Sequence, residues 1–124
     1  MIYLDYQATT PLAPEAREAM LPWLGGPGTA GFANPHSPHR PSRAAAAAVE
    51  VAREQVAALL PPGGRVVFTS GATEAINLAM TGSGASRFAV SAIEHAAVLD
   101  TAQALDPAVQ ILPVDGEGLV DAQV

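Results

Sequence analysis

Short β-rich runs alternate with helical segments over residues 65–114, and this alternation constrains the fold more than any other feature of the sequence. The pattern predicts strands at 65–69, 88–91 and 109–114, with helices at 72–80 and 96–104 between them. A strand–helix–strand–helix–strand order is typical of an α/β layer. We therefore expect an α/β fold with a mostly parallel sheet and flanking helices.

The first 64 residues predict helices and loops around this layer. Residues 1–13 are expected to form an N-terminal arm, and residues 14–124 a single domain. Helices are predicted at 14–24 and at 43–60, the second with Ser42 as its N-cap. Residues 25–41 between them are rich in glycine and proline, which favours either a flexible linker or a shaped binding loop. Residues 119–124 are predicted to begin a further helix, so we expect the domain to continue beyond residue 124.

Composition excludes several kinds of chemistry. The 124 residues contain no lysine and no cysteine, and their formal net charge is −6. A thiol nucleophile, a disulfide and a lysine Schiff base are therefore all excluded from this chain. Its acidity argues against nucleic acid as a direct partner. The sequence has neither a signal-peptide pattern nor an apolar run long enough for a membrane span, so we expect a cytoplasmic protein.

Candidate chemistry is concentrated where predicted strands pass into helices. Gly71, Ala72 and Thr73 open the helix at 72–80, where unpaired N–H groups and the helix dipole favour an anion. The hydroxyls of Ser70 and Thr73 are potential additional donors. This predicts a phosphate site, and the alternative is an ordinary capped helix with Glu74 near its first turn.

Histidines are the other candidates. His95 follows the strand at 88–91, and ligands of open α/β sheets gather at the carboxyl ends of strands. Its imidazole is suited to stacking on a flat cofactor or to moving protons, whereas the alternative is a loop histidine without a special role. His36 and His39 lie in the loop at 25–41, but the spacing of the three histidines matches no metal pattern, so no metal is expected.

Five sequence blocks together resemble one enzyme family. They are DYQATTP at 5–11, NPHSPH at 34–39, FTSGATEAINLAM at 68–80, EHAAVLDT at 94–101 and DGEGLVD at 115–121. In order and spacing they resemble the N-terminal part of cysteine desulfurases, pyridoxal-phosphate (PLP) enzymes of the class V aminotransferase family with fold type I. Two of the blocks, at 5–11 and 94–101, are more similar to the iron–sulfur-cluster and nitrogen-fixation type than to the sulfur-mobilisation type.

The resemblance implies a role for each matching residue. Ala72 and Thr73, next to Gly71, would hold the PLP phosphate, and His95 would stack on the pyridine ring and assist proton transfer. Asn34 and His39 would belong to a loop at the active-site entrance, near the interface of a homodimer. The family converts L-cysteine to L-alanine and passes the sulfur, as a persulfide, to iron–sulfur scaffold or tRNA-modifying proteins.

Departures from the family pattern limit what this chain can do alone. Ala33, His36 and Ser42 replace small or flexible family residues, so the loop departs from the family pattern at these positions. The family's Schiff-base lysine and sulfur-accepting cysteine would lie beyond residue 124. We therefore expect an incomplete large domain that is inactive and poorly stable by itself. The alternatives are a non-catalytic phosphate-binding α/β module, or half of a split class V aminotransferase or selenocysteine lyase.

Overall fold

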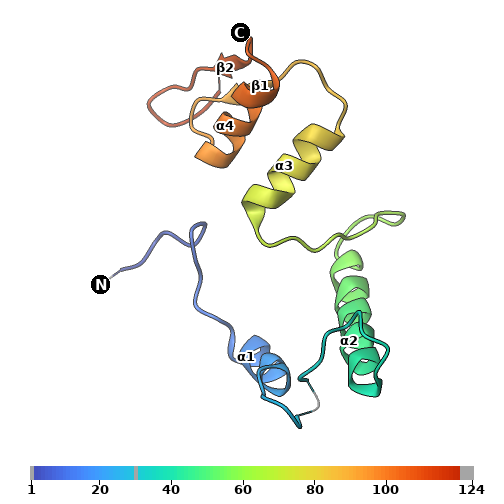
Figure 1. Ribbon diagram of the computed structural model, residues 1–124. Coiled ribbons are helices and arrows are strands. Elements are labelled where there is room, and N and C mark those ends of the chain that lie inside the picture. Colours follow the sequence, from blue (N-terminus) through green and yellow to red (C-terminus); the bar gives the residue numbers. More distant parts are fainter. Residues whose placement is uncertain (1, 30, 121–124) are drawn as a thin grey trace. The chain divides into compact units, whose positions relative to one another are not determined.

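The computed structural model describes residues 2–29 and 31–120 (Figure 1). By its internal contacts the chain divides into two units, Met1–Val67 and Phe68–Val124. The predicted boundary between an arm and a single domain, at residue 13, stays a prediction.

The first unit begins with the arm, which is followed by a short helix that ends in a 3-10 turn. In the arm the Tyr3 hydroxyl donates to the carbonyl oxygens of Asp5 at 2.7 Å and Thr9 at 3.0 Å. Helix α1 covers Pro14–Met20 and continues as the 3-10 helix η1, Leu21–Trp23. Pro14 lies in the first turn of α1, as predicted, where its missing N–H costs no hydrogen bond. Gly31 lies so close to the backbone of Pro22 and Trp23 that a Cβ there would clash. The loop after η1 therefore packs against η1 at Gly31.

Helix α2 covers Arg40–Ala57 and is the longest element of the described chain. The predicted helix is confirmed, but the predicted N-cap is wrong, because His39 occupies that position and Ser42 is buried inside the first turn. Pro41 explains the difference, since proline fits the first turn of a helix and so allows the helix to begin before Ser42. Near the other end, Arg53 donates from Nη1 to the carbonyl oxygen of Val66 at 2.6 Å and ties the next segment to α2.

The second unit contains α3 (Ala72–Gly82), β1 (Ala89–Ser91), α4 (Ala96–Leu105) and β2 (Gln110–Leu112). These four elements match predicted segments closely. Strands β1 and β2 are parallel neighbours, with Val90 opposite Ile111, and α3 and α4 pack against each other. Figure 1 shows α4 beside this small sheet. The unit is therefore of the α/β kind that the sequence predicts.

Two predicted elements at the ends of this unit are wrong. Residues 65–69 form no strand in the described chain, because a β-rich run becomes a strand only where a neighbouring strand accepts its hydrogen bonds. Residues 119–120 do not begin a helix, since Val120 forms an antiparallel bridge with Val114 across the turn at 115–118. The rest of that predicted helix, 121–124, lies outside the described residues.

Burial in the described residues is sparse. The buried apolar residues are Ala45, Val90 and Ala102, all small or medium-sized, whereas Phe68, Leu78 and Ile93 are among many large apolar side chains that are exposed. Alanine contributes little to hydrophobic stabilisation because it buries little area. Hydrogen bonds made by polar groups in the turns therefore stabilise much of the local structure of each unit.

Candidate functional site

The start of α3 offers a set of free hydrogen-bond donors. Gly71 is the N-cap, no side chain caps the helix, and the first bond of the ladder runs from the N–H of Ala75 to the carbonyl oxygen of Gly71 at 3.1 Å. Within the described residues, the N–H groups of Ala72 and Thr73 and the hydroxyl of Thr73 have no partner. A Cβ added at Gly71 would meet no atom within 4 Å, so the backbone there is open to a ligand. These residues fit a phosphate group.

The carboxylate of Glu74 binds the hydrogen-bond donors of Ser70, the residue before the N-cap Gly71. Its Oε2 accepts from the backbone N–H of Ser70 at 2.6 Å and from the Ser70 hydroxyl at 2.7 Å. The first of these bonds is the main reason that the pKa of Glu74 lies below its ordinary value. Ser70 is thus already engaged, whereas the N–H groups of Ala72 and Thr73 are available to an anion.

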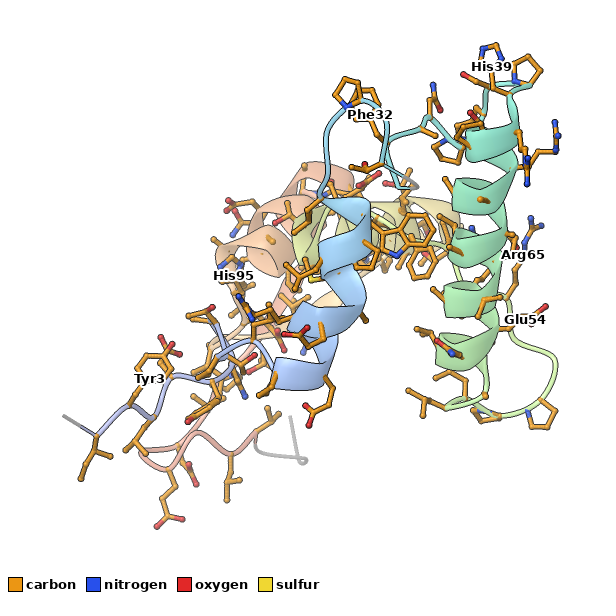
Figure 2. The ribbon with its side chains drawn as sticks, turned by 90° about the horizontal axis from the view of Figure 1, so that it is seen from below. Tyr3, Phe32, His39, Glu54, Arg65 and His95 are labelled. Carbon is orange, nitrogen blue, oxygen red and sulfur yellow. The ribbon has the colours of Figure 1, made fainter. Side chains whose placement is uncertain are left out.

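His95 is the N-cap of α4 and holds the first turn of that helix. Its Nδ1 accepts a hydrogen bond from the backbone N–H of Ala97 at 3.0 Å. The side chain is exposed, and Figure 2 labels it at the start of α4. His95 therefore lies in the same unit as Gly71, Ala72 and Thr73, on a helix that packs against α3.

Asn34 and His39 belong to the first unit, whereas the α3 donors belong to the second. Asn34 shapes its own loop, since its Oδ1 accepts from the N–H of His36 at 2.9 Å. His39 is the exposed N-cap of α2 and makes no side-chain capping bond (Figure 2). The 34–39 block is thus a shaped loop leading into a helix, rather than a flexible linker.

Each unit has a hollow on its described surface. In the second unit, a hollow of about 390 Å³ lies on a face of α3 and is lined by Glu74, Asn77, Leu78, Thr81 and Gly82. In the first unit, a hollow of about 300 Å³ lies between the 34–39 loop and α2 and is lined by Pro35, His36, Ala46, Val49, Glu50 and Arg53. In the described part of the chain, no three His, Asp or Glu side chains gather as a metal site would require. No helix among those described is both long and apolar enough to span a membrane.

Asp106 is an organising residue that sequence reasoning missed. It is 4% exposed, and its Oδ2 accepts from the N–H of Phe88 at 3.0 Å and from Nε of Arg87 at 3.2 Å, while Oδ1 accepts from the N–H of Ala108 at 2.9 Å. The Phe88 bond is the main reason that its pKa is lowered. The signal was the Asp106-Pro107 pair directly after a helical run, because aspartate before proline favours a turn in which the carboxylate binds nearby N–H groups.

The sequence is that of a class-V aminotransferase, and the α/β character of the second unit is consistent with that class. The family model for aminotransferase class-V matches residues 2–124, and the chain belongs to that family.

Within the family, the chain is similar to cysteine desulfurases. It is 42% identical to the mitochondrial cysteine desulfurase of Drosophila melanogaster over 98% of this chain, and 42% identical to cysteine desulfurase IscS of Dechloromonas aromatica over 99%. It is 44% identical to cysteine desulfurase IscS of Psychromonas ingrahamii over 85% of this chain. The resemblance drawn from the five sequence blocks is confirmed. The chain spans only 28%, 32% and 28% of the length of these three relatives.

Proposed function

We propose that these 124 residues are the phosphate- and ring-binding part of a PLP-dependent cysteine desulfurase, within the large domain of a fold type I enzyme. The whole enzyme would convert L-cysteine to L-alanine and pass the sulfur on as a persulfide, for iron–sulfur clusters or tRNA thiolation. It would act as a homodimer. By itself, this chain would bind the cofactor without turning over substrate.

The free donors at the start of α3 carry this proposal. An 11-residue helix presents the N–H groups of Ala72 and Thr73 and the Thr73 hydroxyl with no partner in the described chain. Helix N-termini favour phosphate because these N–H groups and the helix dipole act together. The same unit holds His95 at the start of the neighbouring helix.

Each residue has a distinct task in the proposed enzyme. PLP, when bound, supplies the electron sink of the reaction. Ala72 and Thr73 would bind its phosphate and so fix its position, and the flat imidazole of His95 would lie against the ring and hold or move a proton. Asn34 and His39 would shape the entrance for L-cysteine. The chain contains no lysine or cysteine, so the covalent steps would require side chains that these residues do not supply.

A matched pair of threonines on α3 tests the site. Thr73 is at the first turn and Thr81 is near the last, and both side chains are exposed. Thr73→Ala should weaken PLP binding about tenfold in equilibrium dialysis, because one hydrogen bond to a charged phosphate is lost. Thr81→Ala should leave it unchanged. Equal affinities of the two variants would contradict the proposal.

A non-catalytic phosphate-binding module is the second candidate, and the absence of lysine and cysteine favours it. Pyridoxal without its phosphate separates the two functions. A cofactor site should still bind pyridoxal through His95, and His95→Ala should weaken that binding. A general phosphate module should bind inorganic phosphate as well as PLP and should not bind pyridoxal.

Reading the gene past codon 124 identifies the split-enzyme alternative, which requires a separate gene for the remainder.

A further inference from the structure

The capping bond of α4 determines which nitrogen of His95 carries hydrogen. A neutral imidazole has one N–H donor and one bare acceptor nitrogen. Nδ1 accepts from the N–H of Ala97 at 3.0 Å, so Nδ1 is the bare nitrogen and the hydrogen is on Nε2. No other hydrogen bond to this ring occurs in the described chain.

We propose that the backbone N–H of Ala97 fixes His95 as the Nε2–H tautomer, so that His95 faces its ligand as a hydrogen-bond donor. The Nε2–H group is on an exposed ring and has no partner in the described residues, so it is free to donate. The ligand atom it meets must then be an acceptor, such as a carboxylate, phenolate or thiolate. Ala97 acts here only through His95, as a positioning residue.

This tautomer also restricts how His95 can accept a proton. The only bare nitrogen is Nδ1, and a proton there would remove the acceptor that holds the N–H of Ala97. A proton placed on Nδ1 would therefore uncap α4, whereas a hydrogen bond donated from Nε2–H leaves the cap in place. His95 is thus set to donate a hydrogen bond through Nε2 while Nδ1 holds the first turn of α4.

The inference rests on the proposed function only for the nature of the ligand. The tautomer is a property of the chain without cofactor, so it is measured without PLP. Failure of this measurement and failure of PLP to bind are therefore separate results.

Nitrogen NMR of the histidine-labelled full chain tests the proposal. The protonated and bare ring nitrogens have well-separated shifts, and His36 and His39 serve as internal controls because neither side chain caps a helix by a hydrogen bond. We expect His95 as a single Nε2–H form and His36 and His39 as exchanging mixtures. A His95 ring that exchanges between tautomers, or one protonated at Nδ1, would overturn the proposal.

A pair of proline variants tests the role of Ala97. Ala97→Pro removes the donor, and the His95 signal should change to a mixture of tautomers. Ala96→Pro is the control, because proline is favoured at the first helical position and the extended backbone of His95 tolerates a following proline. It should keep the single Nε2–H form. If Ala97→Pro does not fold, hydrogen exchange of the Ala97 backbone N–H tests the proposal instead. This N–H should exchange about fivefold more slowly in the unaltered chain than in His95→Ala.

Discussion

Hydrogen bonds to individual aspartate carboxylates fix the local structure of the described chain more than apolar contacts do. Asp106 connects the end of α4 to the beginnings of β1 and β2, because its two oxygens accept from Phe88, Arg87 and Ala108. Asp115 closes the turn before Val120 in a similar way, by accepting from the N–H groups of Glu117 and Leu119. Backbone N–H groups near a buried position need such partners, since an unpaired group there is costly.

Asp106→Ala should therefore destabilise the second unit. The N–H groups of Phe88 and Ala108 would lose their acceptor, which weakens the approach of β1 to β2. We expect the midpoint of the broad thermal melt followed by circular dichroism, written Tm below, to fall by several degrees. Asp100→Ala is the matched control, because Asp100 is an exposed aspartate on the same helix. An equal Tm for the two variants would show that the Asp106 contacts are dispensable.

The same carboxylates make stability depend on pH. The fold lowers the pKa of Asp106 below 3.8, chiefly through the Phe88 N–H, and it lowers that of Asp115, chiefly through the Leu119 N–H. A lowered pKa in the folded chain means that the ionised form is bound more tightly, so the stabilisation is present above pH 4 and is lost as the pH falls through the folded pKa. The Tm should thus be level from pH 7 to about 5 and decrease below pH 4. In Asp106→Ala the decrease should be smaller, and an equally steep decrease would contradict this assignment.

Local patterns predict most elements of the described chain. The predictions of α1, α2, α3 and α4 are confirmed because a helix makes its own hydrogen bonds and its pattern is local, and the strands β1 and β2 are confirmed as well. The predicted strand at 65–69 and the predicted helix start at 119–120 are wrong, because strand and bridge formation depend on which segment lies alongside. At the site, Gly71 and the start of α3 could be predicted from local pattern. The bonds from Ser70 to Glu74 and from Ala97 to His95 could not, because they depend on side-chain rotamers.

His95 gives α4 its N-cap, and this structural task can be separated from its imidazole chemistry. His95→Ala should destabilise the second unit by about 1 kcal/mol, the usual cost of losing a capping side chain. His95→Asn should keep most of that stability, because asparagine is among the best N-cap residues. Amide hydrogen exchange in the first turn of α4, compared among the three chains, measures the difference without requiring a cooperative unfolding transition. A similar loss in both variants would show that the bond from Ala97 to Nδ1 contributes nothing to stability.

At the scale of the whole molecule, the sequence is rich in apolar residues, but few apolar side chains of the described chain are buried. Hydrophobic residues make up 49% of the chain, yet 26 of its residues are alanine, and the buried apolar set in the described chain is Ala45, Val90 and Ala102. The exposed large side chains include Leu78 on α3 and Ile111 on β2. Extensive exposed apolar surface marks places where other protein surface binds, or where chains associate.

The isolated chain should therefore keep its helices but lack a cooperative core. We expect far-UV circular dichroism typical of helix, strong fluorescence of the dye ANS on exposed apolar surface, and a broad thermal transition without a sharp calorimetric peak. Association should increase with protein concentration in analytical ultracentrifugation, because exposed apolar side chains bury one another. PLP should make the thermal transition narrower, because it binds the folded N-terminus of α3. Thr73→Ala should reduce this effect, because it weakens PLP binding. A sharp two-state transition of a monomer, with no ANS signal, would show that small residues and polar turns suffice to build a stable core.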